Sequence, residues 1–233
     1  MDTTRRSHLL SLPRGVWTYV RRAPGSYLWL AVLFATTYLM RHLSPRLLND
    51  FLGERSTNLH NLAHDPVRVL ISSAFWLGGG GWILYFVAYN VFHVPAERWL
   101  GTLRWLGVVA VAHIGATYLS EGVLFWAIRH GHAPAAAADT LDVGVSYALA
   151  GVAAVLTYRV AASWRPLYAF CVLVFYGLPL VNGRTFTDIG HVSAVLLGFA
   201  CFPLVRGRPG LGGWDPVAAA RRLVRSARPA PRG

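Results

Sequence analysis

The sequence contains no lysine and few charged residues of any kind. Of its 233 residues only 14% are charged, against about 25% in a typical soluble domain, and all 22 basic residues are arginine. Apolar residues make up 55% of the chain, and the mean hydropathy is +0.42. Because such a chain has too little polar surface to face water, its composition indicates a membrane protein with several spans. It excludes a soluble nucleic-acid binder despite the net charge of +12.

Cysteine is scarce as well. Cys171 and Cys201 both lie inside apolar runs, which favours packing roles over a disulfide or a metal pair. His130 and His132 lie close together, but two ligands do not complete a tetrahedral zinc shell. We therefore expect no metal and no cofactor. No small-residue cleavage site follows the first apolar run, so this run is expected to be an uncleaved span.

Six apolar segments are expected to cross the bilayer as helices. Several have about 16 residues, fewer than the ~20 of a usual full crossing, which suits helices inside a bundle. We therefore predict an all-α, polytopic membrane protein with six transmembrane helices. The segments are residues 27–40, a stretch between Arg68 and Glu97, and residues 105–128, 143–158, 166–182 and 189–205.

The second segment is interrupted by four consecutive glycines at residues 78–81. Glycine costs a helix interior about 1 kcal/mol relative to alanine, so a helix through all four is disfavoured. We predict a loop or re-entrant segment over residues 66–77 and a helix from about Gly81 to Leu100. The first connection then covers roughly residues 41–80, which is long for a compact bundle.

The arginines gather on one side of this predicted membrane domain. With six spans the two termini share a side, and sixteen of the 22 arginines fall there. The positive-inside rule therefore predicts a multi-pass protein of the cell membrane with both termini in the cytoplasm. The chain divides into a basic N-terminal segment (residues 1–25), a membrane domain (26–205) and a basic tail (206–233).

The tail has one predicted element of its own. Asp215 followed by Pro216 is a typical helix start, and arginines cluster in the ten residues that follow. A short basic helix over residues 217–226 would lie on the anionic inner leaflet. A disordered, charged tail is the alternative.

Two polar residues fall at the same depth in different spans. Ser146 lies about one helical turn from the outer end of the fourth span, and His191 about one turn from the outer end of the sixth. At ~1.5 Å per residue, both would lie roughly 5–8 Å below the same membrane face. Serine and histidine within hydrogen-bond reach can act as a nucleophile and its base. Either residue alone more often has a packing role, but their shared depth makes the pair a candidate catalytic site.

Small residues accompany both candidates. Small faces let transmembrane helices approach closely, as a hydrogen bond between the two side chains requires. The residues concerned are Ala150, Ala153 and Ala154 beside Ser146, and Ala194 and Gly198 beside His191. The pattern around Ser146 is not the G-x-S-x-G elbow of α/β-hydrolases, because its fifth residue is Ala148.

Taken in order along the chain, these segments resemble the rhomboid family of intramembrane serine proteases. Gly144-Val-Ser146 is similar to the family's nucleophile motif, and Ala148 and Gly151 continue its small-residue pattern. Residues 188–198, which contain His191, Ala194 and Gly198, are similar to its sixth helix. Residues 68–75 and 97–101 are similar to the approach to its second helix and to the end of that helix. The likeness covers about residues 66–205.

The resemblance implies a six-helix fold that cleaves transmembrane protein substrates. Ser146 would attack the scissile carbonyl, and His191 would act first as general base and then as general acid, with no third acidic member. Asp188 would either cap its helix or orient the imidazole.

The sequence departs from the family pattern around the oxyanion. Rhomboid proteases usually carry a histidine and an asparagine in helix two, where Gly81 and Tyr85 stand here. Tyr85 or Tyr147 would have to supply a hydroxyl instead. Tyr147 also replaces the glycine that usually follows the serine.

Two other functions are considered. The helix-two departures support a catalytically inactive relative that binds the transmembrane helices of client proteins, as a scaffold or quality-control factor. A small transporter or channel would use Glu121, His113 and Asp142. Glu121 and Asp142 are expected near the outer interface, where their side chains would reach water. Transmembrane proteins and the lipid bilayer are the expected partners, and the substrate and oligomeric state stay open.

Overall fold

A computed structural model describes residues 17–78, 81–143, 145–183 and 185–226. In these ranges the chain is helical, and the one strand-like contact is an isolated bridge between Val160 and Trp214. Gly144 of the predicted nucleophile motif lies outside the described residues, as do residues 1–16 and 227–233 of the two basic terminal segments.

Each of the six apolar segments coincides with helix, so the all-α prediction is confirmed. Within the described residues, two helices, α8 and α10, are long and apolar enough to cross a membrane alone. The six segments are α2 (Pro24–Met40), α6 with the π-turn η1 and α7 (Trp82–Ala88, Tyr89–His93 and Val94–Leu100), α8 (Thr102–Arg129), α9 with the 3₁₀ turn η3 (Val145–Val155 and Leu156–Arg159), α10 (Arg165–Asn182), and α11 with α12 (Phe186–Ala200 and Phe202–Val205).

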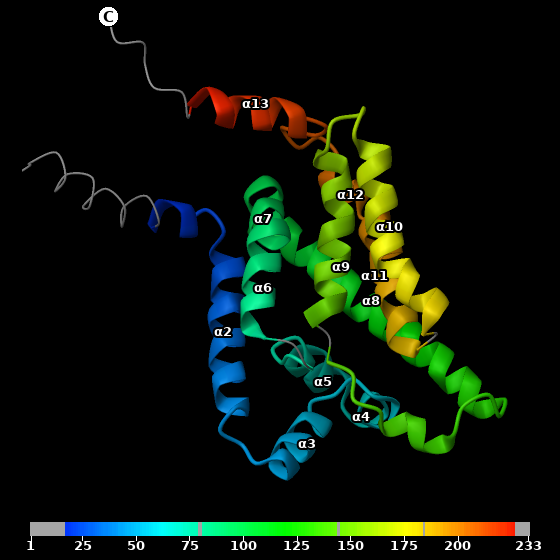
Figure 1. Ribbon diagram of the computed structural model, residues 1–233. Coiled ribbons are helices and arrows are strands. Elements are labelled where there is room, and N and C mark those ends of the chain that lie inside the picture. The colour runs from blue at the N-terminus through cyan, green and yellow to red at the C-terminus, as the bar shows by residue number, and fades with distance from the viewer. Residues whose placement is uncertain (1–16, 79–80, 144, 184, 227–233) are drawn as a thin grey trace, which may run out of the picture.

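Helices α8, α9 and α11 pack together at the centre of the fold, and α8 crosses behind the other two (Figure 1). Helix α10 covers α11, while α2 lies beside α6 and α7 on the other flank. At the centre the backbones approach very closely. A Cβ atom on Gly198 would overlap the carbonyl oxygen of Gly151, and one on Gly151 would overlap the Cβ of Ala112. Small residues thus set the spacing of all three central helices.

A helix begins directly after the glycine run, as predicted. Helix α6 begins at Trp82 with Gly81 as its N-cap. The predicted loop over residues 66–77 is wrong in its first part, where α5 (Pro66–Ser73) forms because the Asp65 carboxylate accepts a hydrogen bond from the backbone N–H of Arg68. After the glycines, the helix passes through η1 just before Pro95. A proline has no N–H and clashes with the carbonyl four residues earlier, and a widened turn accommodates both.

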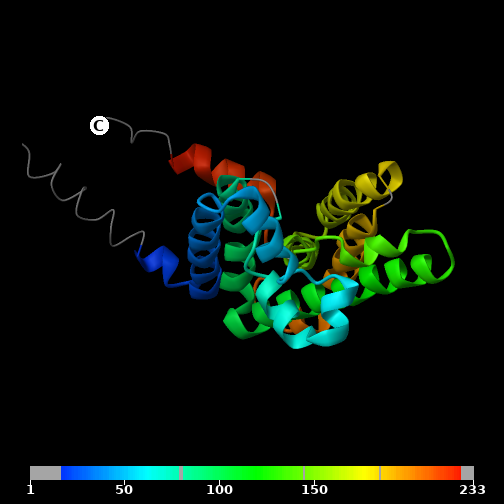
Figure 2. The same ribbon diagram turned by 90° about the horizontal axis from the view of Figure 1, so that it is seen from below.

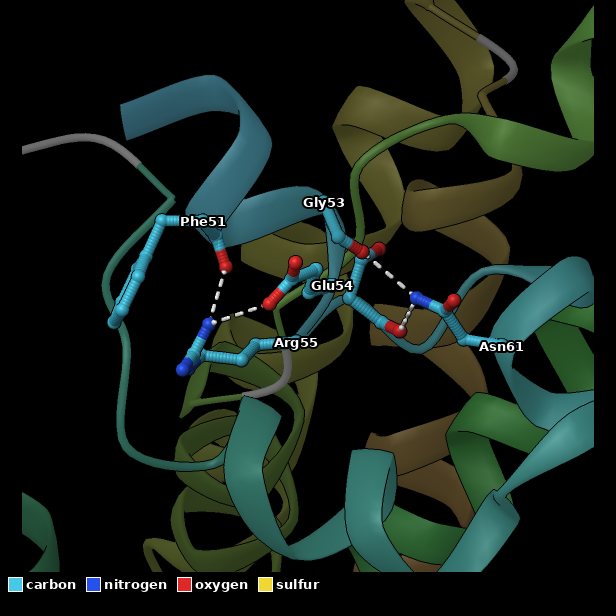
Figure 3. Close-up of polar contacts among 6 residues, drawn as sticks. Phe51, Gly53, Glu54, Arg55 and Asn61 are labelled. Carbon is cyan, nitrogen blue, oxygen red and sulfur yellow. Dashed lines mark hydrogen bonds and ion pairs between the residues drawn. The ribbon is translucent and has the colours of Figure 1, made fainter. Parts of the chain in front are cut away.

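The first connection is also folded, into α3 (Pro45–Gly53), α4 (Leu59–His64) and α5. Seen from below, α4 and α5 lie across the end of the bundle (Figure 2). Asn61 holds the turn between α3 and α4, because its amide donates to the carbonyl oxygens of Gly53 at 2.7 Å and Ser56 at 2.9 Å (Figure 3). Arg55 donates to the Phe51 carbonyl oxygen at 2.9 Å on the other side of the turn.

A buried glutamate joins the first helix to the corner between α7 and α8. The Glu97 carboxylate, 1% exposed, accepts hydrogen bonds from the backbone N–H groups of Gly25 at 2.9 Å and Ser26 at 2.7 Å, in the first turn of α2. It also accepts one from the Thr102 hydroxyl at 2.8 Å. A carboxylate at a helix N-terminus accepts hydrogen bonds from N–H groups that have no partner within the helix, and its negative charge interacts favourably with the positive end of the helix dipole. Gly101 completes the corner with φ +82°, a conformation that favours glycine.

The tail forms the predicted helix, α13 (Pro216–Ser226), rather than the disordered alternative. The Asp215 carboxylate caps it by accepting from the N–H groups of Val217 at 2.8 Å and Ala218 at 3.1 Å. The cysteines are both free. Cys201 is buried as predicted, but the packing role is wrong for Cys171, which is exposed on α10.

The close approach of α9 and α11 predicts the effect of adding one methyl group. Gly198→Ala would press its Cβ against the backbone of Gly151 and against Ala154, whose Cβ would be 2.8 Å away. We expect a loss of about 1–3 kcal/mol, typical of overpacking, measured by thermal or denaturant unfolding in detergent.

Gly177→Ala on α10 is the matched control, since a Cβ there meets no atom within 4 Å. We expect it to be neutral or stabilising by up to about 1 kcal/mol, because alanine is the better helix former. Equal losses in the two variants would contradict the backbone contact.

Candidate functional site

The two residues predicted to form a dyad lie near the beginnings of two contacting helices. Ser146 is in the first turn of α9, and His191 is in the second turn of α11. Both side chains are half-buried. Among the residues that the structure describes, Ser146 and His191 share no hydrogen bond. The structure therefore brings their helices together without joining the two side chains.

Tyr147, rather than Ser146, makes the side-chain contact with His191. Its ring is fully buried and packs edge-on against the imidazole, with ring centroids 5.1 Å apart. The same ring lies against Gly190, where a Cβ would be 2.5 Å from the tyrosine hydroxyl oxygen. Tyr176 of α10 also contacts the imidazole, at 5.7 Å between centroids. Two aromatic rings from two helices thus hold His191 in place.

A buried aspartate just before α9 holds Tyr147 in turn. The tyrosine hydroxyl donates to Asp142 Oδ2 at 3.2 Å. Asp142 is 4% exposed and Glu121 1%, so the expectation that these two side chains reach water is wrong. Burial raises the pKa of Asp142 to about 6, while hydrogen bonds from Tyr147 and Thr57 act in the opposite direction.

The first connection binds the backbone of Asp142. The Asp142 N–H donates to the Ser56 hydroxyl oxygen at 2.7 Å, and the Thr57 N–H donates to the Asp142 carbonyl oxygen at 2.9 Å. These contacts satisfy polar groups that would otherwise be buried without partners. They fix the beginning of α9, and with it Ser146 and Tyr147, against the turn that Asn61 stabilises.

The hydrogen bonds of the Asp188 carboxylate stay at the beginning of its own helix. Its carboxylate accepts from the backbone N–H of Thr185 at 3.0 Å and from the Thr185 hydroxyl at 2.7 Å. Thr185 is the N-cap of α11 and Asp188 is its partner in a capping box. Asp188 therefore caps α11 as expected, but from the third helical position, while Thr185 is the N-cap residue.

The expected oxyanion residues lie at the start of α6. Gly81 caps that helix, and Tyr85 lies one turn further in, half-buried. At the far end of the same helix, His93 Nδ1 accepts a hydrogen bond from the Trp105 indole N–H at 3.1 Å, a structural role.

The three histidines considered from the sequence, His113, His130 and His132, have structural contacts. His113 Nε2 lies 2.8 Å from the Leu70 carbonyl oxygen and joins α8 to α5. His130 and His132 both stack on Trp126. In the described part of the chain, no group of three or more histidine, cysteine or acidic side chains is placed to hold a metal ion.

Two features of this site could not be predicted from the sequence. Tyr176 lies in an apolar span where an aromatic residue gives no signal of its own. Ser56 and Thr57 lie about 85 positions from Asp142, so only the fold reveals that they meet. The burial of Asp142 follows from that meeting.

The chain belongs to the rhomboid-like protein family, whose model matches residues 18–211. The match covers most of the chain and confirms the resemblance seen in the sequence. Family membership supports a membrane location, in agreement with the apolar, all-helical fold. A comparison with curated proteins and one with solved structures found no match.

The buried carboxyl of Asp142 predicts how stability changes with pH. Its pKa is about 6 in the folded chain, above the ordinary value of 3.8. Between about pH 4 and pH 6 the folded state therefore holds a proton that the unfolded state has released, and stability falls as pH rises through this window. At about 1.4 kcal/mol per pKa unit, the change is roughly 2–3 kcal/mol.

Asp142→Asn removes this titration, so its unfolding midpoint should vary less with pH over the same window. The control is Asp139→Asn, which changes an exposed aspartate three residues earlier and should keep the wild-type slope. A wild-type slope in Asp142→Asn would contradict the raised pKa.

Proposed function

We propose that the chain is a rhomboid-type intramembrane serine protease that crosses the cell membrane six times, with both termini in the cytoplasm. The observation that carries the proposal is the backbone contact between α9 and α11. A Cβ on Gly151 would be 3.3 Å from the Ala194 carbonyl oxygen, one turn beyond Ser146 and His191 on their own helices. This close approach of the two helices supports Ser146 and His191 as the proposed pair.

In this proposal Ser146 Oγ attacks the scissile carbonyl and His191 takes its proton. The imidazole then donates the proton to the leaving amine, and water repeats the sequence on the acyl-enzyme. The contacts that Tyr147 and Tyr176 make with the imidazole support its role as a positioned base. Hydrogen bonds between catalytic groups are often long before substrate binds, so the open Ser–His pair is compatible with this mechanism.

The contacts of the tyrosines favour one oxyanion donor over the other. The Tyr147 hydroxyl already donates to Asp142. Tyr85 lies one turn into α6, in the helix where the family carries its polar pair. Tyr85 is therefore the proposed source of a hydrogen bond to the developing oxyanion.

A non-proteolytic client-binding protein is the second candidate. The absence of a hydrogen bond between Ser146 and His191 in the described structure favours it, together with the Tyr147 ring that lies against the imidazole. Such a protein would bind transmembrane helices without cutting them. The two candidates differ in whether Ser146 is reactive.

Labelling with a fluorophosphonate probe separates the two candidates. We expect the folded protein in detergent to be labelled and Ser146→Ala to be unlabelled, because the probe reacts with an activated serine. His191→Ala should slow labelling on the order of 10³-fold, a typical loss for a catalytic base. Ser193→Ala is the control, since it removes another half-buried serine, two residues from His191. Unlabelled wild type, or labelled Ser146→Ala, would reject the protease.

Tyr85→Phe tests the oxyanion assignment separately. Removing one oxyanion donor costs about 10²–10³ in rate, so cleavage of a transmembrane substrate should fall by that factor with little change in substrate binding. Tyr38→Phe, an exposed tyrosine on α2, should cleave like the wild type. An unchanged rate in Tyr85→Phe would assign the donor elsewhere.

A further inference from the structure

A separate cavity lies between α4, the C-terminal half of α8 and the 3₁₀ turn η2 (Ala135–Asp139). Its volume is about 630 Å³, within the range of small-molecule sites. Neither Ser146 nor His191 lines it. Most of the wall is apolar, formed by residues that include Leu59, Leu62, Phe125, Ile128, Ala135 and Ala138.

One ionisable side chain in this wall has no partner. Glu121 is 1% exposed and lines the cavity, and both of its carboxylate oxygens lack a hydrogen bond. In the described residues the two ion pairs are Arg55–Glu54 and Arg68–Asp65, so no arginine neutralises Glu121. A buried carboxyl without a partner is costly whether it is charged or protonated, because it has lost its hydrogen bonds to water.

The neighbouring buried acid, Asp142, differs from Glu121 because it has hydrogen-bond partners. Asp142 is buried nearby and interacts electrostatically with Glu121, but its own polar atoms are bound by Ser56, Thr57 and Tyr147. The fold thus provides hydrogen bonds to one of two neighbouring buried acids and leaves the other without a partner beside the cavity. Two acids close together also strengthen the local attraction for a positive charge.

The remaining polar lining residues indicate the charge of a ligand. Among the described lining residues none is an arginine; Asp139 adds a second acid, His60 adds an imidazole, and Tyr118 and Phe125 contribute aromatic rings. Aromatic faces and carboxylates both attract organic cations. Aliphatic side chains around them fit an apolar body.

We propose that this cavity binds an amphipathic organic cation, whose protonated amine pairs with Glu121 and whose apolar body lies among the α4, α8 and η2 side chains. The ammonium group supplies the hydrogen bonds that both carboxylate oxygens lack. A free aliphatic or aromatic amine carries this chemistry, and so does the ethanolamine head group of a phospholipid. The site does not depend on proteolysis, because it shares no residue with the proposed dyad.

The test measures thermal unfolding of the full-length protein in a non-ionic detergent, titrated with hexylammonium chloride or with 1-hexanol. We expect hexylammonium to raise the midpoint of the wild type and of Ser146→Ala, and hexanol to give no such shift. Glu121→Gln keeps the size of the side chain and removes its charge, and its affinity for hexylammonium should fall at least tenfold. Glu54→Gln, on the surface, is the matched control and should bind like the wild type.

Stability without ligand separates loss of the site from loss of the fold. Because Glu121 is unpartnered, Glu121→Gln without amine should unfold at the same temperature as the wild type or higher. Equal shifts with hexanol, no shift with hexylammonium, or an unchanged response in Glu121→Gln would overturn the proposal. Unfolding in vesicles of phosphatidylethanolamine or of phosphatidylcholine identifies the source of the amine. Greater stability in phosphatidylethanolamine, lost in Glu121→Gln, assigns the lipid head group. Equal stability in the two lipids assigns a free amine.

Discussion

The contact of three helix backbones at the centre of the bundle is the constraint on which the rest of the structure depends. Gly151, Gly198 and Ala112 leave no room for larger side chains where α9, α11 and α8 meet. In a bilayer the lipid tails are as apolar as the side chains, so close van der Waals packing has to hold the helices together. This packing sets the distance between α9 and α11, and therefore the distance between the residues near their beginnings.

Buried polar contacts then determine where each helix begins. Glu97 caps α2 from the corner between α7 and α8, and Ser56 and Thr57 bind the segment before α9. Each contact pairs groups that would be costly to bury alone. The long first connection therefore has a structural role, since its turn fixes the start of the helix that carries Ser146.

The sequence predicts the helices and the pairing of α9 with α11, because apolar length and small-residue spacing are local signals. It fails where a residue's environment comes from distant parts of the chain. From its position alone Asp142 is predicted to lie at the membrane interface, whereas in the fold Ser56 and Thr57 bury it. The helix that begins at Pro66 is not predicted either, because the nearby glycine run favours a loop. The sequence alone suggests that Tyr147 adds bulk beside Ser146. Its ring fits because Gly190, which belongs to another helix, has no side chain there.

Tyr147 also shows how the fold accommodates its departure from the family pattern. A bulky residue after the serine requires a glycine opposite, and Gly190 supplies it directly before His191. The ring then packs edge-on against the imidazole, while the Asp188 carboxylate caps its own helix. A series of contacts therefore runs from Ser56 in the first connection through Asp142 and Tyr147 to the His191 imidazole. Glu121 lies next to this series of contacts and belongs to none of its hydrogen bonds. The proposed organic cation would give this carboxylate the partner that the surrounding hydrogen bonds do not supply.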